Sequence, residues 1–317
     1  MTMKRRTFLQ TTTALTTAGL LPWTQAEAGL LPSIGINLFS IPKMLEKDFR
    51  GGMEFLSRLG FKEIELYGPF PFSSEVAKQT WAKVTPALGF SGSGYYGKTA
   101  TEVKSILADN KLTTPAIHAD LETMRKHMDK LGEAGQTLGF TYIGLPSLPA
   151  EFRKTLDDYK RAADEFNRIG AAAKKVGLRF AYHNHGYGLQ PINGVTPLHI
   201  ILENTDPKLV FFEMDLFWTT AGGADPIELF TKYPGRYHMM HVKDMKKKAR
   251  FSGDGGDSNQ WIELFPYMTS AGEGVLDLKS ILTKAKASGV KHFFVEQDMV
   301  ADPDVSLKKS INYLQTL

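Results

Sequence analysis

Strand-like and helix-like segments alternate along almost the whole chain, and this alternation constrains the fold more than any other feature. Short runs rich in β-branched and aromatic residues are each followed by a longer segment with the spacing of an amphipathic helix. The expected strands are 33–38, 61–67, 113–118, 142–145, 178–185, 211–215, 237–241 and 293–296. The expected helices are 42–59, 74–88, 121–138, 156–176, 197–203, 226–233, 276–288 and 305–317.

Glycine stands between a predicted helix and the next predicted strand at four junctions, at Gly60, Gly139, Gly177 and Gly289. Glycine is favoured there because the residue after a helix often adopts a left-handed conformation. Eight strand–helix alternations of this kind predict an α/β protein with the (β/α)8 TIM barrel fold. A doubly wound open sheet is the alternative, but the first strand is not followed by the G-x-G-x-x-G turn of dinucleotide-binding folds.

The first 28 residues have the organisation of an export signal. Arg5-Arg6 precedes Phe8-Leu9, a mildly apolar stretch covers 11–23, and Ala26-Glu27-Ala28 resembles a cleavage site. The paired arginines are typical of a twin-arginine signal, which predicts a bacterial protein exported to the periplasm. A retained anchor is disfavoured because a spanning helix needs about 20 apolar residues. We therefore expect one domain over 29–317, without stable membrane insertion once the signal is removed.

Charge and cysteine content restrict the partners of the chain. The formal net charge is only +4, which gives no reason to expect nucleic acid as a partner. The chain has no cysteine, so an exported fold must depend on its apolar core rather than on disulfides. A homo-oligomer is compatible with this sequence.

Four of the predicted strands end in a residue type that binds metals, namely His183, Asp215, His241 and Glu296. In a barrel the carboxyl ends of all strands open onto one face, so these side chains are expected to converge. Two imidazoles and two carboxylates suit one divalent ion, such as Mn²⁺, Co²⁺, Mg²⁺ or Zn²⁺. Each residue alone also has a structural interpretation: a core histidine, a helix cap, or a carboxylate paired with a lysine.

One long segment of irregular sequence, 246–274, follows the seventh predicted strand and contains several glycines. Long segments at the carboxyl face of a barrel usually shape or cover the active site. We expect the same here, although a mobile surface insert is the alternative.

Several motifs resemble the xylose-isomerase-like TIM barrels, whose members are commonly described as sugar phosphate isomerases/epimerases. The resemblance covers essentially all of 33–317, and its motifs are HNHG (183–186), FEMDLFW (212–218), HVKD (241–244) and VEQD (295–298). It implies one divalent metal held by His183, Asp215, His241 and Glu296. Ketose epimerases of this family usually carry a glutamate where His183 stands. The segments Tyr-His-x-His, His-x-Lys-Asp and Glu-Gln-Asp look more like inosose dehydratase, a lyase.

The resemblance implies proton abstraction next to the carbonyl of a sugar or keto-sugar, through a metal-stabilised enediolate. Glu296 and His183 are the candidate bases, and Lys243, two residues beyond His241, would steady the oxyanion. Substrate contacts are expected from His185, Glu65, His118 and Trp218. The predicted activity is a metal-dependent sugar isomerase or epimerase. The alternatives are a metal-dependent lyase or dehydratase that releases water or an aglycone from a keto-sugar or 3-keto-glycoside, metal-assisted hydrolysis, and a sugar-binding protein without catalysis.

Overall fold

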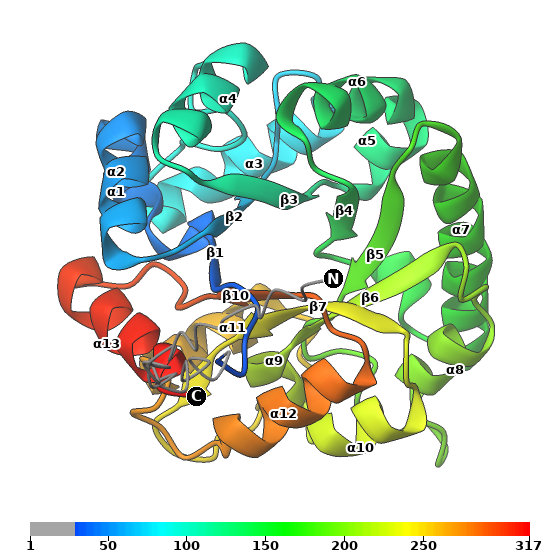
Figure 1. The fold of residues 1–317 in the computed structure, drawn as a ribbon. Coiled ribbons are helices and arrows are strands. Elements are labelled where there is room, and N and C mark those ends of the chain that lie inside the picture. Colours follow the sequence, from blue (N-terminus) through cyan, green and yellow to red (C-terminus); the bar gives the residue numbers. More distant parts are fainter. Residues whose placement is uncertain (1–28) are drawn as a thin grey trace, which may run out of the picture.

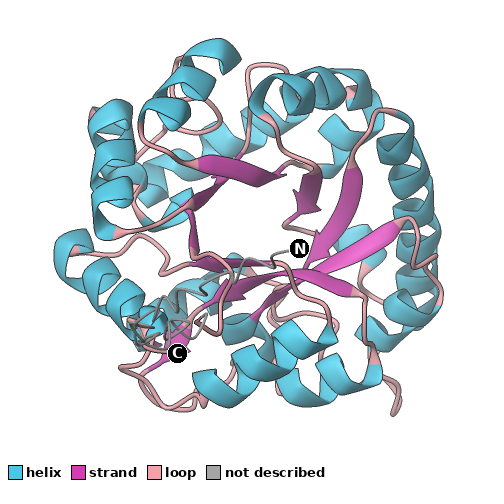
Figure 2. Ribbon diagram, viewed as in Figure 1, coloured by secondary structure: helices cyan, strands magenta, loops and turns pink. Residues whose placement is uncertain are grey.

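Eight parallel strands close into a barrel and helices surround it, as Figures 1 and 2 show. This computed structural model describes residues 29–317, so the predicted export signal lies outside the described residues. The order around the barrel is β1-β10-β7-β6-β5-β4-β3-β2. Its strands are β1 (Gly35–Asn37), β2 (Glu63–Tyr67), β3 (Thr113–His118), β4 (Tyr142–Leu145), β5 (Arg179–His183), β6 (Val210–Asp215), β7 (Tyr237–Val242) and β10 (His292–Val295). The predicted TIM barrel is confirmed, and the open sheet is excluded.

Most of the helices form the outer ring and pack apolar faces against the outside of the barrel. Their bounds within the described residues are α1 (Pro42–Lys47), α2 (Phe49–Leu59), α3 (Glu75–Leu88), α4 (Ala100–Asp109), α5 (Leu121–Lys126), α6 (Met128–Leu138), α7 (Leu156–Lys175), α8 (Pro197–Glu203), α9 (Leu216–Ala221), α10 (Pro226–Lys232), α11 (Ser258–Leu264), α12 (Leu278–Ser288) and α13 (Pro303–Gln315). Over residues 29–317, none of these helices combines the length and the apolar character that crossing a bilayer requires.

Two helices expected to be continuous are each divided into two. The expected helix 42–59 is interrupted at Asp48, whose side chain accepts a hydrogen bond from Gly51 N and so begins α2. The expected helix 121–138 is interrupted at His127, which lies between α5 and α6. Helix α4 was not predicted, although Thr99 and Glu102 form a capping box at its start.

The glycine junctions adopt the predicted conformation. Gly60, Gly139, Gly177 and Gly289 have φ values of 109°, 95°, 80° and 111°. Because a side chain is strained in this left-handed region, glycine lets the chain turn there from each helix into the following strand.

The strands aim alternate side chains into and out of the barrel. On β6, Phe212 and Met214 contribute to the core beneath the helices, whereas Phe211 packs with the cluster that fills the barrel's lower end. That cluster contains Ala116, Tyr142, Ala181, Met239 and Phe294. Glu213 and Asp215 share the inward face with Phe211, because successive side chains of a strand point to opposite sides.

The long segment after β7 has more structure than its sequence suggested. Besides α11 it contains a short strand, β9 (Met268–Thr269), which pairs antiparallel with β8 (Asp244–Met245). Asp244 holds the segment's far end, because its carboxylate accepts hydrogen bonds from Gly272 N and Gly274 N at 3.0 Å. Trp261 of α11 stacks on His185, with ring centroids 4.5 Å apart. The long segment therefore lies beside His185, one of the residues expected to contact substrate, and its role in shaping or covering an active site remains a prediction.

Candidate metal centre

Three histidines form one group inside the barrel. His118, His183 and His241 come from β3, β5 and β7, which are alternate strands, and alternate strands supply one layer of a barrel interior. Their ring centroids lie 4.4 to 5.4 Å apart. Gly144 of β4 leaves room for them, since a Cβ atom there would lie 2.5 Å from Cδ2 of His118.

Two carboxylates meet the histidines on the side toward the strand ends. Asp215 Oδ2 lies 3.8 Å from both His183 Nε2 and His241 Nδ1. Glu296 Oε2 lies 2.7 Å from His241 Nδ1. The structure therefore brings together all four side chains predicted to bind a metal, and each of them is buried. Metal binding by this set remains a prediction.

Asp215 also acts as a helix cap, which was the structural alternative considered for it. Its Oδ1 atom accepts a hydrogen bond of 2.8 Å from Trp218 N at the start of α9. Its Oδ2 atom faces the histidines and Lys243. Asp215 thus caps α9 with Oδ1 and faces the histidines with Oδ2.

Lys243 is buried among three carboxylates rather than paired with Asp244 at the surface. Its Nζ atom lies 3.0 Å from Asp215 Oδ2, 2.5 Å from Glu296 Oε2 and 2.8 Å from Asp298 Oδ2. Burial opposes its charge, but these carboxylates raise the pKa of Lys243 well above its ordinary value. The ammonium group is therefore charged at neutral pH and lies within the predicted site.

A second pair of carboxylates lies on the other side of the histidines, deeper in the barrel. Glu213 Oε2 is 2.6 Å from His118 Nε2 and 3.2 Å from His183 Nδ1. Glu65 Oε2 is 2.7 Å from His241 Nε2 and accepts a 2.8 Å hydrogen bond from Asn37 Nδ2. We call Glu65, His118 and Glu213 the inner layer, and Asp215 and Glu296 the outer carboxylates.

Burial and neighbouring charges separate the protonation behaviour of these groups. Burial, assisted by the charge on His241, lowers the pKa of His183 to about 4. Burial also lowers the pKa of His241. The carboxylates of Glu213, Glu296 and Glu65 outweigh this effect and raise the pKa of His241 well above its ordinary value. Burial opposes the charge of Glu296, but Lys243 and His241 lower the pKa of this carboxyl well below its usual range. His183 is therefore a neutral imidazole and Glu296 a carboxylate at neutral pH.

The donor set and its charge fit a divalent cation. Four carboxylates, those of Glu65, Glu213, Asp215 and Glu296, lie within 3.8 Å of the three imidazoles. Among the described residues, Lys243 is the one lysine paired with any of them. Glu65 Oε1 and Glu213 Oε1 are buried and make no hydrogen bond with any described residue. Asp215, His241 and Glu296 offer ligand atoms within 4.8 Å of one another, and so do His118, His183, Glu213 and His241. A mixed nitrogen and oxygen set of this kind suits Mn²⁺, Co²⁺ or Zn²⁺.

The residues predicted to contact substrate lie in two places. Glu65 and His118 belong to the inner layer, where their polar atoms meet His241 and Glu213. His185 and Trp218 lie beside the long segment, with ring centroids 6.0 Å apart. Lys243 Nζ is 5.1 Å from the Trp218 ring centroid, so this indole borders the outer side of the site. Their binding of substrate remains a prediction.

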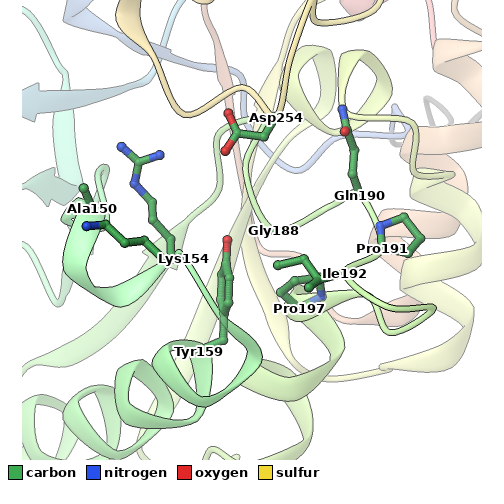
Figure 3. Close-up of a pocket in the computed structure, with 10 residues that line it drawn as sticks. Ala150, Lys154, Tyr159, Gly188, Gln190, Pro191, Ile192, Pro197 and Asp254 are labelled. Atoms are coloured by element: carbon green, nitrogen blue, oxygen red, sulfur yellow. The ribbon is translucent and has the colours of Figure 1, made fainter.

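A separate pocket of about 440 Å³ lies among the loops after β4 and β5, as Figure 3 shows. Its lining includes Lys154, Tyr159, Gln190 and Asp254. It shares no lining residue with the histidine and carboxylate cluster among the described residues, so it is distinct from the candidate metal centre.

Three residues of the cluster were not singled out from the sequence as site residues. Glu213 stands two residues before Asp215, so the two-residue period of a strand signals that both point to the same side. Asp298 lies beyond the end of β10, where that period does not apply. Asn37 ends β1 and meets Glu65 across 28 positions of sequence. No local pattern identifies that contact.

Comparison with known proteins reveals relatives of this chain. A family model described as xylose isomerase-like TIM barrel matches residues 53–317. An inosose dehydratase from Bacillus cereus is 27% identical over 226 residues, which are 67% of this chain and 73% of that protein. A sugar phosphate isomerase/epimerase from Parabacteroides distasonis has a similar fold, with a TM-score of 0.66 at 24% identity, and the match covers 92% of this chain and 96% of that one. The structure of the IolI protein with a bound zinc atom has a TM-score of 0.64 at 15% identity, covering 90% of this chain and 95% of that one.

Proposed function

The chain belongs to the xylose isomerase-like TIM barrel family, and on that basis we propose that it is a metal-dependent sugar isomerase or epimerase. The proposed reaction begins with removal of a proton from the carbon next to a carbonyl group. The observation that carries the proposal is the convergence of two imidazoles and two carboxylates from β5, β6, β7 and β10 at one place inside the barrel. A divalent cation held by His183, Asp215, His241 and Glu296 would supply Lewis acidity that polarises the carbonyl.

Glu296 is the group of the chain best suited to move the proton. It is anionic at neutral pH because Lys243 and His241 hold its pKa down, although burial opposes this. A carboxylate that binds a metal through one oxygen keeps lone pairs on the other. His183 is neutral, since burial lowers its pKa to about 4, but its one lone pair would be occupied by the metal in the proposed site. Glu296 is therefore the proposed base.

Lys243 is proposed to stabilise negative charge on the substrate oxygen. Its ammonium group keeps its proton, because Asp215, Asp298 and Glu296 raise its pKa against the effect of burial. A fixed positive charge in a buried site stabilises a developing oxyanion more strongly than it would in water. The three carboxylates around Nζ hold it within the cluster.

Elimination is the second candidate reaction, and a specific observation favours it. The curated relative reported above is an inosose dehydratase, and the residue at the end of β5 is His183 rather than the glutamate that resemblance to ketose epimerases would place there. After the same proton abstraction, loss of water or an aglycone from a keto-sugar or 3-keto-glycoside would give a lyase.

The two outcomes are separated by incubating the protein with sugars, keto-sugars and glycosides in deuterium oxide, with Mn²⁺, Co²⁺, Mg²⁺ or Zn²⁺ added. Products are followed by NMR. Deuterium incorporation into a sugar with all its substituents retained supports an isomerase or epimerase, whereas release of water or an aglycone supports a lyase. Catalysis that persists after complete removal of metal, confirmed by elemental analysis, would refute the proposal.

We also propose that the protein is exported, on the basis of Arg5-Arg6 and the Ala26-Glu27-Ala28 segment. Fractionation of a bacterial host should place the shortened protein in the periplasm. Replacing Arg5 and Arg6 by lysine should retain it in the cytoplasm at full length, because the twin-arginine pathway reads that pair. Equal periplasmic yield of both forms would contradict the signal type.

A further inference from the structure

The two buried glutamates of the inner layer face the histidines from the side opposite the outer carboxylates. Both are completely buried. Glu213 Oε2 lies between His118 Nε2, at 2.6 Å, and His183 Nδ1, at 3.2 Å. One carboxylate oxygen has two lone pairs and can accept a hydrogen bond from each ring. Glu65 Oε2 is the corresponding acceptor for His241 Nε2, at 2.7 Å, and Asn37 Nδ2 holds that oxygen in place.

His183 and His241 each direct their two ring nitrogens to different carboxylates. Nδ1 of His183 faces Glu213, whereas its Nε2 faces Asp215. Nε2 of His241 faces Glu65, whereas its Nδ1 faces Glu296 and Asp215. Each ring is thus held between an inner glutamate and the outer carboxylates.

A histidine binds a metal through one nitrogen only if that nitrogen has lost its proton, and the other nitrogen then carries the proton. We propose that Glu213 and Glu65 are positioning residues that fix the protonated nitrogen of His183 and His241, respectively. Glu213 keeps the proton of His183 on Nδ1, so Nε2 is the ligand atom. Glu65 keeps the proton of His241 on Nε2, so Nδ1 is the ligand atom. The inference deepens the proposed function and rests on it.

The packing around the inner layer supports a positioning role. The Cβ position at Gly144 would lie 3.5 Å from Glu213 Oε2 as well as 2.5 Å from the His118 ring, so His118 fills the gap that β4 leaves beside Glu213. His118 Nε2 also lies 3.4 Å from Glu65 Oε1 and therefore connects the two glutamates. An ordered carboxylate holds an imidazole in one orientation, and loss of such a partner typically lowers metal affinity 10- to 100-fold.

The same inner atoms could instead hold a second cation, because His118, His183, Glu213 and His241 offer ligand atoms within 4.8 Å of one another. The contacts favour the positioning role: each inner nitrogen already lies within hydrogen-bonding distance of a glutamate oxygen. Asp215 Oδ2 lies 3.8 Å from both rings, a spacing that leaves room for an ion between them. The number of ions bound per protein molecule distinguishes the positioning role from a second cation site.

The test measures Zn²⁺ binding by competition with a chelator, together with the ring nitrogen signals of ¹⁵N-histidine-labelled protein. Wild-type protein should bind one ion, with the His183 proton on Nδ1 and the His241 proton on Nε2. Glu213→Gln should lower the affinity about 10- to 100-fold and alter the His183 ring signals, while Glu65→Gln should alter those of His241. His183→Gln and His241→Gln assign the signals.

A matched control is Glu165→Gln, which changes a buried glutamate of α7 that pairs with Arg125 and Arg168 outside the cluster. It should leave Zn²⁺ affinity unchanged. If Glu213→Gln does not fold, Glu213→Leu supplies a variant of similar volume without the acceptor. One ion bound with unchanged affinity and ring signals in the inner-layer variants would overturn this inference alone. Two ions in wild type, with one lost in Glu213→Gln, would overturn it in favour of a second cation site. No ion bound by wild type would overturn the proposed function and the inference together.

Discussion

Metal binding should release a proton from His241. The number of protons released for each ion bound follows from the contacts of the His241 ring. Nδ1 and Nε2 of His241 each lie 2.7 Å from a carboxylate oxygen, of Glu296 and Glu65 respectively. Because each of these carboxylates is an acceptor when ionised, the contacts favour the doubly protonated ring in the metal-free protein, with each nitrogen donating one hydrogen bond. This agrees with the raised pKa of His241, which the surrounding carboxylates produce despite burial. A metal ligand must be the neutral ring, so binding removes one of these protons.

Three other groups of the site, His183, Glu296 and Asp298, contribute little to the exchange at pH 7. The pKa of His183 is about 4 because of burial, so this ring is already neutral. Glu296 is already ionised. Burial raises the pKa of Asp298 to about 6, so this carboxyl is mostly ionised as well. We expect the release of about one proton for each ion bound. Below the pKa of His241, each pH unit should weaken binding by about 1.4 kcal/mol, or tenfold.

Isothermal titration of the metal-free protein with Mn²⁺ measures this release. The observed enthalpy is plotted against the ionisation enthalpy of several buffers at pH 7, and the slope gives the number of protons. Mn²⁺ is preferred because Zn²⁺ lowers the pKa of bound water to about 7 and would add a proton of its own. His199→Gln, a change in α8, should leave the slope unchanged. In His241→Gln, any Mn²⁺ binding that remains should release no proton and give a slope near zero. A slope near zero in wild type would show that His241 is not the protonated ligand.

Three further perturbations test other parts of the structure. Glu296→Gln should reduce turnover about 10²- to 10⁴-fold with little change in the circular dichroism spectrum, because the proposed base is lost; full activity would show that another residue takes the proton. Asp244→Ala should lower the free energy of unfolding in urea by roughly 2 kcal/mol and speed amide exchange at Gly272 and Gly274, because their buried acceptor is removed; unchanged exchange there would refute its role in holding the long segment. Burial lowers the pKa of His238 from 6.5 to about 4, so the unfolded chain takes up a proton before the folded protein does and stability falls as pH drops through this window. Between pH 7 and 5 the free energy of unfolding of the wild type should therefore fall by roughly 1 kcal/mol more than that of His238→Gln, a value reduced for the partial exposure of His238. Equal decreases in urea unfolding would contradict this.

The barrel could be predicted because its pattern repeats. Strand runs of four to eight residues, helical spacing and a glycine between them recur, and all eight expected strands are present. Two of them, 113–118 and 142–145, have the predicted bounds, and the other six have shifted ends. Helix α9 could not be found in this way, because its six residues are almost all buried and show no polar face. The breaks at Asp48 and His127 depend on local capping and backbone conformation, to which apolar spacing is insensitive.

The outer half of the cluster could be predicted because barrel topology brings strand ends together. The inner layer could not be predicted as a unit, because it depends on which side chains reach across the interior. Glu65 and His241 are 176 positions apart, yet their atoms lie 2.7 Å from each other. Both residues were singled out, but their contact requires the closed barrel. Glu213 had a local signal in its two-residue offset from Asp215, because residues two apart on a strand point to the same side.

The two oxygens of Asp215 have a consequence for anyone who surveys variants of this protein. An alanine at position 215 would remove the cap of α9 and the group facing the histidines together, so a loss of function there would report nothing about which was needed. Asparagine separates them, because its amide oxygen can still accept from Trp218 N while its NH2 group replaces the other carboxylate oxygen. A protein that folds normally as Asp215→Asn but no longer takes up metal would show that capping and metal uptake depend on different oxygen atoms of the same side chain.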